Sequence, residues 1–200
     1  FSGYSHIAIG TAKILGFDLM KNFDHPYLSM SVKEFWRRWH ISLSTWFRDY
    51  LYIPLGGSRC SKLKKYRNIL ITFLVSGLWH GAGWKFVVWG GLHGVYQILE
   101  DIFLPKIKRL ADKTGMKVHT GGVRLARMLL TFCAVDFAWI FFRADSMRDA
   151  VGIIARIFCR FQVWNLLDGS MFQLGLKSTE WTVLILGLLI VYATYVIEKK

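Results

Sequence analysis

The stretch that decides the fold reads NILITFLVSGLWHGAGWKFVVWGGLHGVYQILEDIF, from Asn68 to Phe103. Lys85 is its only charged residue before the acidic pair near its end. About 20 apolar residues span a bilayer as a helix, so the stretch is long enough for two spans. A Gly-Ala-Gly turn at 81–83 interrupts it, and membranes tolerate such a break when it is packed in protein or lines a cavity. We therefore predict two membrane helices, at 68–80 and 84–103.

Composition and charge agree with a membrane protein. The 200 residues are 54% apolar and 16% aromatic, whereas soluble domains are about 45–50% apolar. Lysine and arginine outnumber acidic residues by 26 to 13, which gives a net charge of +13. Such an excess often indicates nucleic-acid binding, but here the cations lie between long apolar runs, as in cytoplasmic loops of membrane proteins. We therefore expect membrane lipids, and no nucleic acid, as partners.

Two further apolar segments predict additional spans, at 125–142 and 181–197. The predicted fold class is therefore all-α, a multi-pass helical membrane protein. Basic residues precede and follow the hairpin, so the positive-inside rule assigns both flanking loops, and the tail after the last span, to the cytoplasm. The segment 143–180 would then face outside, although it contains four arginines.

The segment 31–52 differs in kind from the apolar stretches. Ser31 and Glu34 have the spacing of a capping box, which predicts a helix start. The helix is expected to end near the Pro-Leu-Gly-Gly run at 54–57. Because it mixes tryptophans and phenylalanines with several arginines, it is too charged to cross lipid freely. We expect it to be interfacial or to line a cavity within the protein.

His80 lies in the motif SGLWHGAG, which also contains Ser76 and Trp79. A titratable side chain in so apolar a segment suggests a functional site. Gly77 and Gly81 flank it on the same helical side, and two interpretations of these glycines stay open. They leave space beside a reacting imidazole, or they let two helices pack closely while His80 bonds a neighbouring backbone group.

A second histidine, His40, follows the aromatic and cationic run FWRRW. In a continuous helix it would share a face with Arg37, Ser44 and Trp36, three or four residues away. That neighbourhood suits a polar acyl donor or its phosphates. The alternative is an aromatic belt at the membrane interface with snorkelling arginines, which the residues alone slightly favour.

Other chemistry has little support in the sequence. Cys60, Cys133 and Cys159 have neither metal-binding nor disulfide spacing. The sequence contains no GxSxG, P-loop, Rossmann or zincin motif. We therefore expect no bound metal or cofactor. His93, within the apolar stretch, is a weaker catalytic candidate.

Two long motifs resemble a known family. They are FWRRWHISLSTWFRDYLYIPLGGSR (Phe35–Arg59) and SGLWHGAGWKFVVWGGLHG (Ser76–Gly94). Both resemble the membrane-bound O-acyltransferase family, in particular its bacterial branch related to the alginate O-acetylation protein. The similarity covers nearly the whole chain. One departure is His6, which stands where the family usually has aspartate.

The resemblance implies a tunnel between the two membrane faces, with His80 as the primary catalytic histidine and His40 as the second. It also implies a cytoplasmic thioester donor, an acyl-CoA such as acetyl-CoA or an acyl-carrier protein, and a hydroxyl acceptor on or beyond the outer face. The residues expected to bind substrate are Trp36, Arg37, Arg38, Trp39, Ser44, Ser76 and Trp79.

Family chains are longer, so residues 1–200 are expected to form the C-terminal part of a single domain of this family in a bacterial cytoplasmic membrane. An extracytoplasmic acyltransferase is the expected protein partner. Acetyl transfer to an exported polysaccharide is the main prediction, and D-alanyl transfer to teichoic acid is its alternative. A non-enzymatic transporter whose histidines relay protons, or a scaffold that recruits a transferase, stays open as well.

Overall fold

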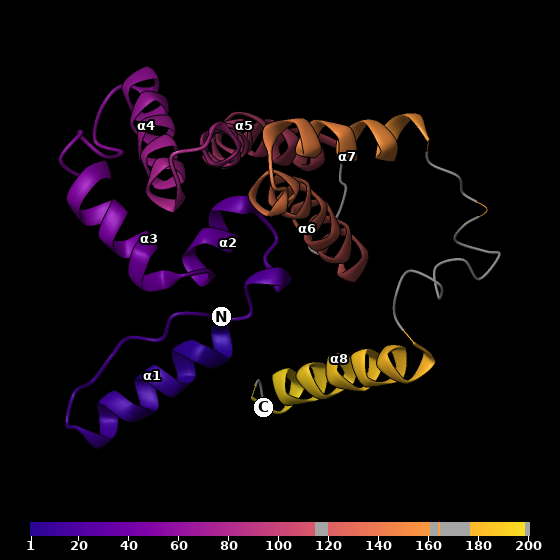
Figure 1. Cartoon of the computed structure of the whole chain (residues 1–200). Coiled ribbons are helices and arrows are strands. Elements are labelled where there is room, and N and C mark those ends of the chain that lie inside the picture. Colours follow the sequence, from indigo (N-terminus) through magenta and orange to yellow (C-terminus); the bar gives the residue numbers. More distant parts are fainter. Residues whose placement is uncertain (115–119, 161–163, 165–176, 199–200) are drawn as a thin grey trace. The chain divides into compact units, whose positions relative to one another are not determined.

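The computed structural model describes residues 1–114, 120–160, 164 and 177–198, and their regular secondary structure is helical (Figure 1). The chain divides into two compact units, Phe1–Ala150 and Val151–Lys200. The first unit contains α1 (Ser2–Ile14), the 3₁₀-helix η1 (Pro26–Leu28), α2 (Val32–Arg38), α3 (Ile41–Phe47), the π-helix η2 (Arg48–Tyr52), α4 (Lys62–His80), α5 (Trp84–Thr114) and α6 (Gly121–Arg143). α7 (Met147–Cys159) crosses the boundary between the units, and the second unit also contains α8 (Ser178–Glu198).

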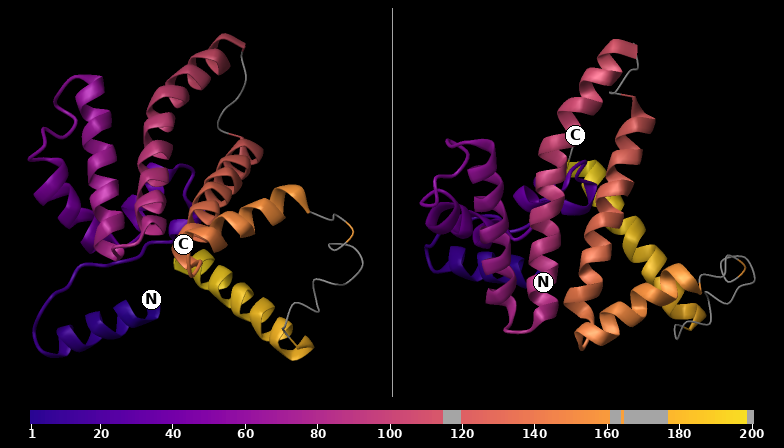
Figure 2. Two further views of the ribbon diagram at one scale, coloured as in Figure 1. Left: turned by 45° about the horizontal axis from the view of Figure 1, so that its top comes forward. Right: turned by 90° about the horizontal axis from the view of Figure 1, so that it is seen from above.

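The predicted helical hairpin is confirmed. α4 ends at His80, the glycine turn follows, and α5 begins at Trp84. Both helices extend past their predicted outer ends, since α4 starts at Lys62 and α5 continues to Thr114. The two helices run side by side in Figure 2, and α6 packs against α5.

Glycines set the distance between α4 and α5. A Cβ added at Gly77 would overlap the carbonyl oxygen of Phe86, and one added at Gly90 would overlap that of Phe73. Only a residue without a side chain lets two backbones approach this closely, as in small-xxx-small contacts of membrane helices. Close helix packing is therefore the correct interpretation of Gly77.

By length and composition, α6 is the one helix among the described residues able to cross a membrane, and the predicted span 125–142 lies within it. The helices that contain the predicted spans 68–80 and 84–103 do not meet the same criterion of length and apolar composition. α4 opens with a cluster of lysines, and α5 contains several polar residues, including an acidic pair. The predicted span 181–197 lies within α8, whose 21 residues run from Ser178 to Glu198. Within the segment 143–180, residues 161–163 and 165–176 lie outside the described residues.

The prediction of one helix over 31–52 is wrong. Its start is confirmed, because Ser31 Oγ accepts from the Glu34 backbone N–H at 3.0 Å. The helix then stops at Arg38, and His40 adopts a left-handed backbone with φ 45° and ψ 55°. The reason is a competing partner, since the segment 22–24 pairs with the backbone on either side of His40 and draws it out of the helix.

A carboxylate from α5 holds the start of α2. Glu100 accepts from the backbone N–H groups of Val32 and Lys33, two of the donors that a helix N-terminus leaves unpaired. The next residue, Asp101, pairs with Lys65 on α4 and lies 3.6 Å from Lys33 Nζ. This acidic pair therefore joins α2, α4 and α5 at one point.

The glycine contact predicts a sharp difference between neighbouring positions on α5. Gly90→Ala should destabilise the protein by about 1–3 kcal/mol, the usual cost of overpacking, because its methyl group overlaps the Phe73 carbonyl. Gly91→Ala is the matched control, since its Cβ would lie 3.5 Å from Leu74 Cδ2, an ordinary contact. Thermal unfolding of the full-length protein in detergent measures both. Equal melting temperatures for the two variants would contradict the close contact.

Candidate functional site

His80 ends α4 within a group of aromatic rings. Its imidazole centroid lies 4.9 Å from that of Trp79, 5.0 Å from that of Trp89 on α5 and 5.3 Å from that of Phe142 on α6. The ring is half-buried, and no hydrogen bond among the described residues involves it. The interpretation that His80 bonds a neighbouring backbone group therefore has no support here. Neither ring nitrogen has a hydrogen-bond partner among the described residues.

The glycines beside His80 do not leave a cavity next to the imidazole. A Cβ at Gly81 would overlap the ring of Phe86, and the backbone of the same residue fills the space at Gly77. The interpretation of these glycines as room beside a reacting imidazole is therefore wrong.

His40 lies between α2 and α3, at the left-handed residue that precedes α3. Its ring contacts those of Phe1, at a centroid distance of 4.9 Å, and Phe23, at 6.2 Å. Burial lowers the pKa of His40 below its usual value, an effect partly opposed by a hydrogen bond to its own backbone. Because the helix is broken here, His40 does not share a helical face with Arg37, Ser44 and Trp36 as predicted.

Tryptophans join the two histidines. The ring centroid of Trp39, the residue before His40, lies 5.3 Å from that of Trp139. The Trp139 centroid lies 5.6 Å from that of Trp89, and Trp89 contacts His80. The histidines are close enough for a charge on His40 to act on His80. An aromatic wall therefore links them, and Trp39 is part of it.

A pocket of about 440 Å³ lies beside this wall, among α2, α3, η2, α4 and α5. It collects four of the residues that the sequence predicted for substrate binding, namely Trp36, Arg37, Ser44 and Ser76. The remaining three lie elsewhere. Arg38 pairs with Glu34 at 2.7 Å, Trp39 belongs to the aromatic wall, and the exposed Trp79 contacts His80 edge to face.

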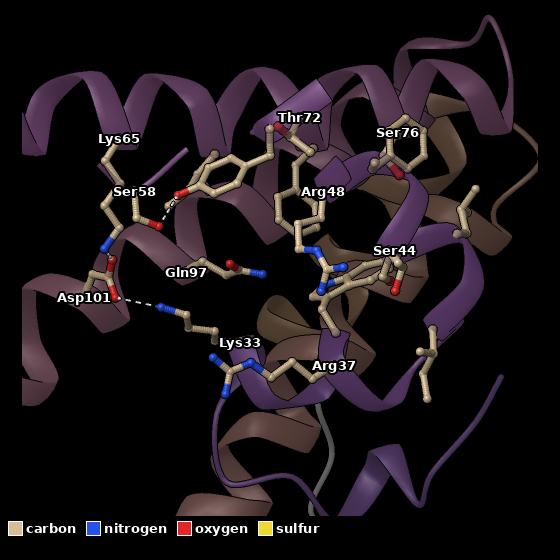
Figure 3. Close-up of a pocket in the computed structure, with 18 residues that line it drawn as sticks. Lys33, Arg37, Ser44, Arg48, Ser58, Lys65, Thr72, Ser76, Gln97 and Asp101 are labelled. Atoms are coloured by element: carbon tan, nitrogen blue, oxygen red, sulfur yellow. Dashed lines mark hydrogen bonds and ion pairs between the residues drawn. The ribbon is translucent and has the colours of Figure 1, made fainter. Parts of the chain in front are cut away.

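The pocket is cationic. Lys33, Arg37, Arg48 and Lys65 line it, against the single lining carboxylate Asp101. Figure 3 shows Lys33 and Lys65 reaching Asp101 from opposite sides, with the Arg48 guanidinium across the pocket. Arg48 also pairs with Asp49, which is not part of the lining, whereas no ion pair among the described residues involves Arg37. The arrangement can bind an anion.

Sequence reasoning missed several residues of the lining. Arg48 and Tyr52 both lie on η2, and π-helical turns often occur at functional sites. The RDYLY string gives no recognisable π-helix signal. Lys65, Gln97 and Asp101 come from other helices and are assembled only by the fold. No histidine among the described residues belongs to the pocket lining. His40 and His80 lie outside it, as do His6, which is exposed on α1, and His93, which is fully buried in α5.

The described part of the chain thus combines a span-like helix, two histidines joined by an aromatic wall and a cationic pocket that can hold an anionic ligand. Residues 1–141 match the model of MBOAT, the membrane-bound O-acyltransferase family, and the chain belongs to this family. The family is a multi-pass helical membrane fold, which confirms the predicted fold class.

Several bacterial proteins are similar to this chain. The probable alginate O-acetylase AlgI of Azotobacter vinelandii is 42% identical over 199 residues, which cover 100% of this chain and 37% of that protein. The peptidoglycan O-acetyltransferase of Helicobacter pylori is 40% identical over 77% of this chain and 28% of its own length. The teichoic acid D-alanyltransferase of Streptococcus thermophilus is 33% identical over 71% of this chain and 37% of its own length. The chain thus spans about a third of the length of these curated relatives.

Proposed function

We propose that the protein to which this chain belongs is a membrane-embedded O-acyltransferase. It moves an acyl group, acetyl in the main proposal, from a cytoplasmic thioester to a hydroxyl of an exported polysaccharide or of a partner transferase. The observation that carries the proposal is the half-buried imidazole of His80, which has no hydrogen bond among the described residues and lies in the LWHG motif that carries the family resemblance. Residues 1–200 contribute the C-terminal part of a single acyltransferase domain.

His80 is the general base of the proposed reaction. It takes the proton of the acceptor hydroxyl while that oxygen attacks the thioester carbonyl. The carbon–sulfur bond then breaks, and the leaving thiolate receives the proton from His80. The acyl group ends on the acceptor oxygen as an ester. A half-buried imidazole without a hydrogen bond among the described residues suits this role.

His40 orients the acyl thioester or polarises its carbonyl. The cationic pocket beside the aromatic wall binds the phosphates of the donor, and it includes Arg37, which makes no ion pair with any residue that the structure describes. Arginine suits phosphate because its planar fork can donate two parallel hydrogen bonds. The donor is an acyl-CoA, acetyl-CoA in the main proposal, or a thioester on a carrier protein, whose pantetheine arm also ends in a phosphate.

Relatives favour acetyl over D-alanyl as the transferred group. The O-acetylases share 40–42% identity with this chain, whereas the D-alanyltransferase of Streptococcus thermophilus shares 33%. D-alanyl transfer to teichoic acid therefore stays the second candidate. The bacterial relatives also support a location in a bacterial membrane, which we propose is the cytoplasmic membrane. The proposed protein partner is an extracytoplasmic acyltransferase.

His80→Ala should abolish acyl transfer, because the acceptor hydroxyl loses its base, while the protein still inserts. The measurement uses membranes containing the full-length protein, labelled acetyl-CoA and isolation of labelled product. His6→Ala is the control, since His6 is an exposed histidine on α1. Product at the wild-type level in His80→Ala would refute the assignment. Ion or solute flux without a thioester, and no labelled product, would instead favour a transporter.

Arg37→Ala should raise KM for acetyl-CoA about tenfold, the scale of one lost charged hydrogen bond, with little change in kcat. Acetyl-pantetheine lacks the nucleotide and its phosphates, so KM for that donor should not change. Lys13→Ala, on the exposed surface of α1, controls for a general loss of positive charge. Equal effects of Arg37→Ala on both donors would show that Arg37 does not bind phosphate.

Acyl transfer should fall on acidification with a midpoint below about pH 6.5, the ordinary pKa of histidine. Burial lowers the pKa of His40, so its neutral form persists to more acidic pH than that of an exposed histidine. Initial rates between about pH 4.5 and 8, the range over which histidine titrates, measure the midpoint. A midpoint above the ordinary value would mean that His40 is stabilised in its charged form.

A further inference from the structure

Two polar side chains next to His40 have no part in the function proposed above. Asn22 lies between α1 and η1, and Ser42 lies in the first turn of α3. The Ser42 backbone N–H donates to Asn22 Oδ1 at 3.2 Å, and Ser42 Oγ is 3.0 Å from the same oxygen. Ser42 Oγ is also 3.5 Å from His40 Nδ1, at the long end of hydrogen-bond range. The three side chains form a chain of contacts that ends on the imidazole.

The backbone N–H of Ser42 determines which atom donates and which accepts in each of these contacts. A backbone N–H can only donate, so the Asn22 atom that faces Ser42 is the amide oxygen and not the nitrogen. An amide oxygen only accepts, so the Ser42 hydroxyl donates its single proton to Asn22. Ser42 Oγ is then left to accept from His40 Nδ1, which must carry a proton. The nitrogen that remains for substrate is His40 Nε2.

The segment 22–24 also fixes the backbone conformation of His40. A left-handed conformation costs a non-glycine residue free energy and persists only where the surroundings enforce it. The Asn22 carbonyl accepts from the Ile41 N–H at 2.9 Å, and the Asp24 N–H donates to the Arg38 carbonyl at 2.9 Å. These two bonds bracket His40 in the sequence. Asn22 thus acts on His40 through both its backbone and its side chain.

We propose that Asn22 and Ser42 are positioning residues that hold His40 with Nδ1 protonated, so that Nε2 is the nitrogen presented to the substrate during acyl transfer. The proposal rests on the acyltransferase function proposed above. Neither residue touches the substrate, since Asn22 acts through Ser42 and Ser42 acts through the imidazole. The Ser42 contact is expected to shorten when substrate binds, as hydrogen bonds at unliganded sites commonly do.

Asn22 makes one further hydrogen bond, through which it could have a purely structural role. Asn22 Nδ2 donates to Ser5 Oγ on α1 at 3.2 Å, and this bond attaches α1 to the loop. Ser5→Ala removes that bond and leaves the bonds between Asn22, Ser42 and His40 intact. It is therefore the matched control for Asn22→Ala.

The test compares steady-state acetyl transfer by variants of the full-length protein in membranes. Ser42→Ala and Asn22→Ala should lower kcat about tenfold, the scale of one lost hydrogen bond on a reacting group, with KM for acetyl-CoA unchanged. Ser42→Thr keeps the hydroxyl and should restore most of kcat. Ser5→Ala should leave kcat within about twofold of the wild type, as expected for a partly exposed neutral hydrogen bond.

The dependence of acyl-transfer activity on pH is a second measurement, and a change in packing alone would not shift it. Asn22→Asp keeps the accepting oxygens and adds a negative charge near His40, which favours the protonated imidazole and raises the pKa of His40. The loss of activity on acidification should therefore shift to higher pH than in the wild type. The charge of His40 also acts on His80, so His80 is retained in every variant.

Three results would overturn the proposal: wild-type kcat in Ser42→Ala, an equal loss in Ser5→Ala and Asn22→Ala, or an unshifted pH profile in Asn22→Asp. Immunoblots of membranes and melting temperatures in detergent separate loss of protein from loss of kcat. If Asn22→Ala does not accumulate, Ser42→Ala and Ser42→Thr decide the question. Wild-type protein without any acyl transfer would overturn the proposed function as well, so the two failures are distinguishable.

Discussion

The rest of the site depends on the close contact between α4 and α5 at Gly77 and Gly90. Because these helices lie backbone against backbone, Trp89 on α5 reaches His80 at the end of α4. The same approach brings the acidic pair of α5 to the lysines at the other end of α4. A larger residue at either glycine would push the two helices apart. It would therefore displace both the rings around His80 and the acidic pair. One steric constraint therefore sets the geometry of His80 and of the cationic pocket.

The features predicted correctly from sequence are local ones. The hairpin follows from an apolar run interrupted by glycines, and the start of α2 follows from a capping residue three positions before Glu34. Each signal lies within a few residues of its effect. The family resemblance was likewise carried by two uninterrupted motifs. It indicated His40 and His80 together as catalytic candidates, which neither periodicity nor charge could do.

The break at His40 could not be predicted in this way. Local sequence favours a continuous helix, and the partners that interrupt it come from the segment 22–24, well upstream. The pocket poses the same difficulty, because Lys33, Arg48, Lys65 and Asp101 are distant in sequence and belong to four different elements. Counting apolar residues likewise could not reveal that a carboxylate of α5 holds the start of α2.

The carboxylate of Glu100 has a consequence for the order of assembly. Glu100 accepts a hydrogen bond from the Val32 N–H, 68 residues earlier in the sequence. During synthesis, the residues of α2 are therefore made long before the carboxylate that stabilises the start of α2. A seven-residue helix is too short to persist alone in water. α2, and with it the turn that holds His40, should therefore acquire its final form only after α5 is synthesised and packed against α4. The second histidine is assembled late in biogenesis, when the first already has its helix.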